Sequence, residues 1–179
     1  MSLPILHSIV GASLVALCYR RNSLAKDWRF LLIGALIAVI PDFDYLLVYG
    51  LDMSHESHRS FTHSIFFSLA VTLLALIVTR FSCIKRTVVC GLALISHGIL
   101  DFLITSATGG VKLLYPLSDK RLEFEMIGIF ERMDNSLLEF INQASLEVIL
   151  FVPIFLLLLL VREFLVSGSV IESDNYQAD

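Results

Sequence analysis

Residues 144–166 read ASLEVILFVPIFLLLLLVREFLV, an apolar run in which only Glu147, Arg162 and Glu163 carry charge. At about 1.5 Å of rise per residue, 23 residues make a helix roughly 34 Å long. That length is sufficient to cross the ~30 Å hydrocarbon core of a bilayer. The stretch therefore predicts a transmembrane helix, and with it a membrane protein.

Four further apolar stretches precede this one, and the chain as a whole is strongly hydrophobic. They cover residues 3–19, 28–49, 61–79 and 87–104. Of the 179 residues 56% are hydrophobic, and the mean hydropathy is +0.80, well above that of soluble domains. We expect an all-α polytopic bundle of about five transmembrane helices, with residues 1–166 forming one integral membrane domain. Residues 122–140 look amphipathic and could form an interfacial helix, and residues 167–179 are expected to be a disordered cytoplasmic tail.

Basic residues predict the orientation of this bundle. They gather in the loops after the first and third stretches: Arg20, Arg21, Lys26, Arg29, Arg80, Lys85 and Arg86. Lys and Arg favour the cytoplasmic side, so the N-terminus, residues 50–60 and residues 105–143 should face outward. The net charge of −4 and the lack of a basic patch argue against nucleic-acid binding. Cys18, Cys83 and Cys90 form no CxxC pair and are interpreted as small hydrophobes.

Histidines and acids gather near the outward end of every predicted helix. They are His7, Asp42, Asp44, His58, His63, His97, Asp101 and Glu147. A carboxylate inside an apolar helix costs on the order of 3 kcal/mol without a partner. Few basic side chains lie nearby, whereas a divalent metal would bind carboxylates and neutral imidazoles together. The pattern therefore predicts a metal site.

The spacing of these residues refines the prediction. His97 and Asp101 are four apart and share one helix face. Asp42 and Asp44 would diverge on an unbroken helix, and Pro41 often kinks one. The two acids could therefore serve different ions, or one an ion and the other the second nitrogen of a histidine. The predicted metal ligands suffice for two or three ions: His7, Asp42, Asp44, His58, His63, His97 and Asp101. Nitrogen and oxygen ligands favour Zn²⁺, with Mn²⁺ or Fe²⁺ as alternatives.

Three residues receive predicted catalytic roles. Asp44 or Glu147 would move a proton, and Arg59 would bind a substrate phosphate. Alternatives stay open: His7 could be a packing histidine, Glu147 could pair with Arg121, and Arg59 could anchor to lipid headgroups. His55 is interpreted as a solvated loop residue.

Several of these motifs together resemble the YdjM family of bacterial inner membrane proteins, whose members are described as membrane-bound metal-dependent hydrolases. The matching pieces, spread over residues 3–120, are His7, PDFD at 41–44, HRSFTHS at 58–64, SHGILD at 96–101 and GVKLLYPLS at 110–118. The resemblance implies a metal-dependent hydrolase in the inner membrane. The HxxxD pair is also similar in style to the zinc ligands of zinc-dependent phospholipases C and nucleases.

Three functions are therefore considered. The leading hypothesis is a membrane-embedded hydrolase that cleaves a lipid or lipid-linked ester or phosphoester at the extracytoplasmic face. A proton- or ion-coupled transporter would also use intramembrane acids and histidines. A non-catalytic membrane subunit would hold its metal as a structural element. The sequence leaves substrate, metal count and oligomeric state open.

Overall fold

The computed structural model describes residues 4–18, 24–52, 58–104, 109–124 and 137–176. Its elements in chain order are α1 (Pro4–Cys18), α2 (Leu24–Ile37), the 3-10 turn η1 (Ile40–Phe43), α3 (Asp44–Gly50), the 3-10 turn η3 (Phe61–His63), α4 (Ile65–Val78), α5 (Ile84–Ile104) and α6 (Leu137–Tyr176). Within these ranges the only β-type pairing is an isolated bridge between Val111 and Leu122. The expected all-α class is confirmed. His55 lies outside the described residues.

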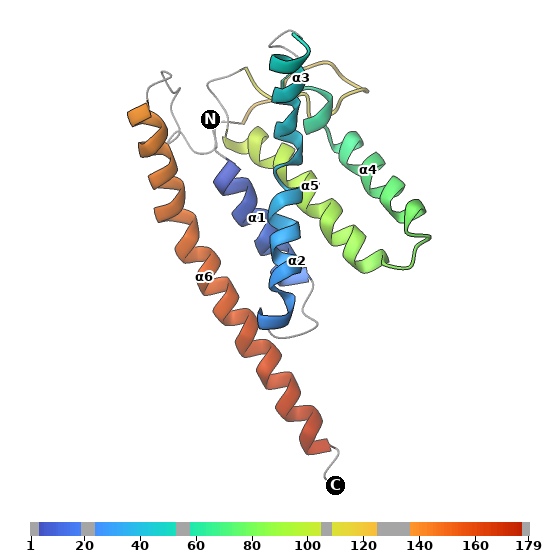
Figure 1. The fold of residues 1–179 in the computed structure, drawn as a ribbon, viewed down its shortest axis with the longest axis vertical. Helices are drawn as coiled ribbons and strands as arrows, with labels where there is room; N and C mark the ends of the chain where they lie inside the picture. The colour runs from blue at the N-terminus through green and yellow to red at the C-terminus, as the bar shows by residue number, and fades with distance from the viewer. Residues whose placement is uncertain (1–3, 19–23, 53–57, 105–108, 125–136, 177–179) are drawn as a thin grey trace.

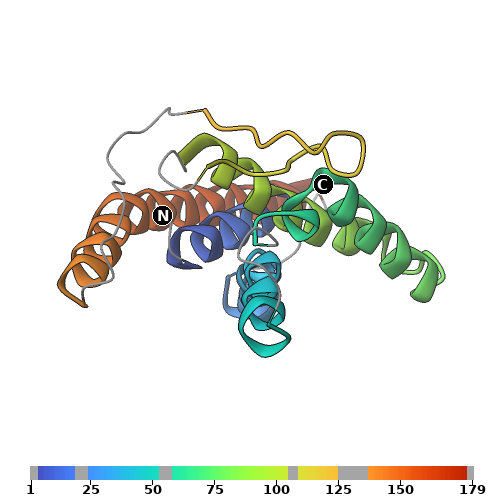
Figure 2. The same cartoon turned by 90° about the horizontal axis from the view of Figure 1, so that it is seen from above.

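The helices run alternately up and down, so that several of their ends meet at one end of the molecule. Helix α1 packs against α2, α5 and α6, and α4 pairs with α5. Figure 1 shows the start of α1, the end of α5 and the starts of α4 and α6 at the top of the view, together with α3 and the loop 109–124. Seen from above in Figure 2, α6 runs along one side of α1 while α4 and α5 extend away from it.

Two helices are long and apolar enough to cross a membrane, fewer than the five that the sequence predicts. They are α5 and the segment 141–165 of α6. Helices α1 and α4 are apolar but have only 15 and 14 residues. At about 1.5 Å per residue each is close to 22 Å long, short of the ~30 Å core. The described residues therefore contain two candidate spans and not the five that the sequence predicts.

The predicted helix over residues 28–49 is broken, which is the second difference. Helix α2 ends at Ile37, and η1 and α3 follow in its place. Pro41 has no N–H to continue the α-helical ladder, and Asp42 N donates to Val39 O at 3.1 Å instead of to Ala38 O. The break leaves the Ala38 carbonyl without its usual helical donor.

The C-terminal region also differs from the expectation. Helix α6 continues through Tyr176, so residues 167–176 of the predicted disordered tail are helical. Adding residues to an existing helix needs no new nucleus, which explains how a polar segment can extend one. Of the predicted interfacial helix, residues 122–124 are not helical, residues 125–136 lie outside the described part, and residues 137–140 begin α6.

A buried ion pair joins the helices at the end opposite α3. Arg162 of α6 donates to the Asp27 carboxylate of α2, and its Nε donates to the Ala16 carbonyl of α1 at 3.2 Å. Both charged side chains are at most 5% exposed. The same residue therefore holds α6 against two other helices.

Candidate metal centre

Two imidazole rings face each other at the upper end of the bundle. The Nε2 atoms of His63 and His97 lie 3.1 Å apart, and both side chains are fully buried. His97 Nδ1 donates to the Ala38 carbonyl at 2.7 Å, the carbonyl that the break after α2 exposes. In the neutral ring Nε2 of His97 therefore presents its lone pair to the other histidine.

The tautomer of His63 follows from its neighbours in the same way. The Thr62 hydroxyl donates its proton to Asp44 Oδ2 at 2.9 Å. Thr62 Oγ1 also lies 3.0 Å from His63 Nδ1. Because its proton is already donated to Asp44, Thr62 Oγ1 can only accept there, so His63 Nδ1 carries the proton. Two Nε2 lone pairs then point at each other at hydrogen-bond distance, an arrangement that a shared cation would stabilise.

Two carboxylates complete this group. Asp42 Oδ1 lies 3.3 Å from His97 Nε2 and 3.6 Å from His63 Nε2. Asp101 Oδ2 lies 3.4 Å from His63 Nε2 and 3.9 Å from His97 Nε2. A tetrahedral ion with bonds of about 2.0 Å has ligand atoms about 3.3 Å apart. Four of the five separations given above lie between 3.1 and 3.6 Å, near this value, and the fifth is 3.9 Å, so the donor set suits Zn²⁺.

The approach of His63 to α5 depends on a glycine. A Cβ atom built on Gly98 would lie 2.1 Å from the His63 carbonyl oxygen. Only a residue without a side chain lets the η3 backbone lie directly on α5 beside His97. The G in SHGILD therefore has a packing role between the two histidine-bearing elements.

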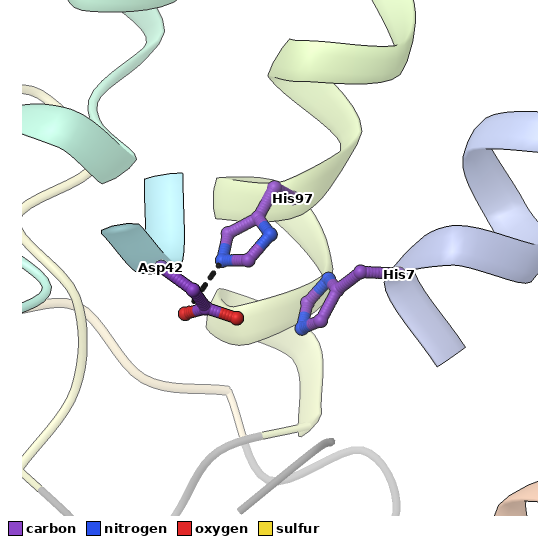
Figure 3. A group of neighbouring side chains, drawn as sticks. All are labelled: His7, Asp42 and His97. Carbon is purple, nitrogen blue, oxygen red and sulfur yellow. Dashed lines mark ion pairs between the residues drawn. The ribbon is translucent and has the colours of Figure 1, made fainter. Parts of the chain in front are cut away.

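His7 adds a third imidazole from α1. Its ring stacks on His97, with centroids 3.8 Å apart, and its Nε2 lies 3.5 Å from Asp101 Oδ1. His7, Asp42 and His97 also form a group whose donor atoms could hold an ion, as Figure 3 shows. His7 is only 1% exposed. Its position fits a metal ligand, and it also fits a histidine that packs against His97.

Asp44 organises the loop that carries the other histidines. Its carboxylate lies 2.7 Å from His58 Nδ1 and accepts from Thr62 Oγ1 and from the Arg59 backbone N–H. Burial alone would raise the pKa of Asp44, which lies outside the two candidate spans, but its bond to His58 holds that pKa below its ordinary value. An ionised Asp44 accepts the proton of His58 Nδ1 and leaves Nε2 as the open nitrogen of that ring.

The cluster has an excess of negative charge. Its carboxylates are Asp42, Asp44 and Asp101, and the guanidinium beside them is that of Arg59, whose Nε lies 3.2 Å from Asp101 Oδ2. With neutral histidines these four residues leave two negative charges, of which only the Asp42 carboxylate is partly exposed, at 19%. Burying unbalanced charge is costly, and one divalent cation would neutralise it.

The loop 109–124 covers the His58–His63 segment. Lys112 N donates to Arg59 O at 3.1 Å, and Ile65 N donates to Leu113 O at 3.0 Å. Arg121 donates to the Gly110 and His58 carbonyls, so it holds two loops together. The motif at 110–118 is thus a structural cover.

The predicted metal ligands are therefore brought together, in three overlapping groups of donors: His7, Asp42 and His97; Asp44, His58 and His63; His63, His97 and Asp101. Arg59 and Glu147, which the sequence predicts to be catalytic, contact other partners than a substrate site requires. Arg59 is buried against Asp101, and Glu147 accepts a hydrogen bond from Leu6 N at 3.1 Å, in the first turn of α1. Glu147 belongs to none of the three groups found among the described residues.

Sequence reasoning missed two contributors. The Ala38 carbonyl orients His97, and Thr62 links Asp44 to His63. Thr62 could have been found from its place beside His63 in the same short motif. The Ala38 carbonyl had no signal in the sequence, because its availability depends on the three-dimensional break after α2.

An all-helical protein with two candidate membrane spans and a buried histidine–aspartate cluster is, as a class, a helical membrane protein with a potential metal centre. The chain belongs to the YdjM family: the family model "YdjM inner membrane protein" matches residues 1–168. A curated relative, "Inner membrane protein YbcI" of Escherichia coli (strain K12), is 35% identical over 99 residues, covering 52% of this chain and 57% of the relative. The match thus spans little more than half of either protein. No solved structure matches the chain.

Proposed function

We propose that this protein is a membrane-embedded, metal-dependent hydrolase that cleaves an ester or phosphoester of a lipid or lipid-linked substrate. The observation that carries the proposal is the convergence of His63 Nε2 and His97 Nε2 on two carboxylate oxygens. Zn²⁺ is the preferred metal for this donor set and Mn²⁺ is the alternative. The proposal needs one ion at this place, because Asp44 and His58 are bonded to each other.

The metal would supply Lewis-acid activation of a water and of the phosphoryl or carbonyl oxygen of the substrate. His58 is the residue best placed to take a proton, because Asp44 holds its Nδ1 and leaves Nε2 open. Asp44 keeps the ring oriented through its contact with Nδ1. This assignment moves the proton role from Asp44 itself, and from Glu147, to the Asp44–His58 pair.

Arg59 would act on Asp101 more than on the substrate. Its guanidinium is 4% exposed and lies against the Asp101 carboxylate. By holding Asp101 it would fix one ligand of the central ion. Asp42, at 19% exposed, has the most accessible carboxylate of the cluster and marks the side from which substrate would enter.

The orientation of the site is part of the proposal. Basic residues lie in or next to the start of α2, the end of α4 and the start of α5: Lys26, Arg29, Arg80 and Lys85. Figure 1 shows these helix ends at the opposite end of the molecule from α3. The positive-inside tendency would place that end in the cytoplasm. The cluster would then face the extracytoplasmic leaflet of the inner membrane, where the expected substrates are lipids.

Elemental analysis of the protein purified in mild detergent tests the metal. We expect stoichiometric Zn or Mn in the wild type, and its loss in His97→Ala and Asp42→Ala. Ser96→Ala is the matched control, because the Ser96 hydroxyl donates only to the Ala93 carbonyl of its own helix in the described structure. Hydrolysis of lipids in proteoliposomes should disappear with the metal and return when the metal is added back. A metal-free wild type prepared without chelators would refute the proposal.

A structural metal is the second candidate, and one observation favours it. The two histidine nitrogens and the two carboxylate oxygens beside them could together fill every position of a single Zn²⁺, as structural sites do. Cobalt substitution separates the two functions. If added inorganic phosphate changes the visible spectrum of the Co²⁺ protein, a coordination position is open, as catalysis requires. A spectrum insensitive to phosphate would favour the structural role.

A further inference from the structure

An apolar, open-sided cavity lies beside the metal cluster, where α2 and η1 approach α4 and α5. It has a volume of about 110 Å³ and is lined by residues of α2, η1, α4 and α5, of which Ile40 and Val71 are 42% and 38% exposed. Ile37 and Ile40 form one wall, Val71 and Ala75 the second, and Leu94 part of the third. None of the residues assigned to the cluster lines it.

The lining offers no polar partner to a ligand. Its two hydroxyls are already bonded within their own helices: Thr72 Oγ1 donates to Ser68 O at 2.7 Å, and Thr87 Oγ1 donates to Cys83 O at 3.1 Å. The remaining described lining is aliphatic apart from Cys90 and Gly91. A ligand of this cavity gains only by burying apolar surface, so its chemistry is that of a hydrocarbon.

The cavity is elongated along the axis of α5. On α5 its lining extends from Thr87 to Leu94, about 10 Å along the helix axis. Leu94 is one helical turn before His97, and Ile40 is two residues before Asp42. The cavity therefore starts next to the cluster and runs parallel to α5, a candidate span, as lipid chains run in a bilayer.

We propose that this cavity takes the acyl chain of a membrane lipid whose carboxylic ester lies at the cluster. This deepens the proposed hydrolase function and rests on it. The cavity begins within one turn of His97, so the chain must be joined directly to the reacting group. An acyl ester meets that condition, whereas glycerol separates the chains from a headgroup phosphodiester. The narrow volume suits one unbranched chain.

The implied reaction is ester hydrolysis. The oxygen of water bonds to the acyl carbon, and the bond between that carbon and the alcohol oxygen breaks. One proton of the water goes to the departing alcohol, and the other leaves with the fatty acid. No oxidant or further reactant is needed.

Photo-crosslinking tests the occupant without relying on activity. The full chain is reconstituted with phosphatidylglycerol that carries a diazirine in the middle of one acyl chain, and adducts are located by mass spectrometry. We expect adducts on the cavity residues Val71, Ala75 and Cys90 above the level on the exposed face of α6. Equal labelling of the cavity and of that face would overturn the proposal.

Variants sharpen the result. Ala75→Trp fills the cavity and should abolish cavity adducts, and Cys90→Phe should do the same from the opposite wall. Leu74→Trp is the control, because Leu74 is the next residue on α4 but is 61% exposed. Competition of the cavity adducts by a polyprenyl phosphate, and not by fatty acid, would replace the acyl chain by an isoprenoid and contradict the proposal.

One further variant separates this inference from the proposed function. His97→Ala should lose metal and hydrolysis but keep the cavity adducts, since His97 does not line the cavity. Cavity adducts in a wild type that binds no metal would refute the hydrolase and leave a lipid-chain site. Bound metal and lipid hydrolysis without cavity adducts would refute the chain site alone.

Discussion

Each central histidine is oriented by an oxygen on the side of its ring that faces away from the cluster. For His97 this oxygen is the Ala38 carbonyl, and for His63 it is the Thr62 hydroxyl, which is itself bonded to Asp44. Such partners fix the tautomer and the direction of a metal-binding ring. At the scale of single residues, the site is thus prepared for a cation on the open side of both rings.

The role of Asp44 can be tested by Asp44→Asn. The amide cannot hold His58 and Thr62 as the carboxylate does, so metal affinity or hydrolytic rate should fall about 10–100-fold. Competition with a metal chelator measures the affinity. Asp119→Asn is the matched control, because that carboxylate is 79% exposed and pairs with Lys112. Unchanged affinity and rate in Asp44→Asn would show that Asp44 does not support the site.

At the scale of elements, the contact of η3 with α5 determines the geometry of the cluster. These two elements carry His63 and His97, and Gly98 lets their backbones touch. The break after α2 has the complementary effect, because it turns Asp42 toward the same place. Three short-range features, a glycine, a proline and a 3-10 turn, thereby bring ligands from separate helices together.

Gly98→Ala tests this contact. The added methyl group must push η3 away from α5, since it would otherwise lie 2.1 Å from the His63 carbonyl oxygen. We expect loss of most bound metal while the helical circular dichroism stays unchanged. Gly50→Ala is the control, because a Cβ there meets no atom within 4 Å. Full metal content in Gly98→Ala would mean that the cluster tolerates a shift of η3.

At the scale of the whole molecule, the two ends of the bundle contain different groups of buried charged residues. The upper end holds the cluster, and the lower end holds the buried pair of Arg162 and Asp27. In the family of inner membrane proteins to which the chain belongs, a charge within an apolar span is expected to be paired or functional. Here Arg162 connects α6 to α1 and α2, which keeps α6 beside the bundle.

Arg162→Met should therefore destabilise the fold without changing the site. Removing one partner of a buried pair leaves an uncompensated charge and costs about 3–5 kcal/mol. Unfolding in mixed detergent measures the loss, and Lys112→Met, which breaks an exposed pair, should have a much smaller effect. The double variant Arg162→Met with Asp27→Leu should recover part of the stability. A double variant no more stable than the single one would argue against the pair as the cause.

The sequence by itself determined the helical class, the candidate residues and one ligand pair. Apolar runs are long enough to indicate helices before any contact is known, because each helix satisfies its own backbone. His97 and Asp101 share a face because four residues make about one turn, and the structure confirms their proximity at 3.9 Å. The sequence also singles out His7, Asp42 and His63 as candidates, since acids and histidines are rare in apolar stretches.

Only the tertiary structure decided which partner each of these residues contacts. Asp42 and Asp44 differ by two positions, yet one faces the histidine pair and the other supports His58, because the chain breaks at Pro41. Glu147 lies at the first turn of α1, and Arg59 against Asp101, because helix packing places them there. Distances between separate helices depend on side-chain volumes at every contact, and local sequence patterns do not contain that information.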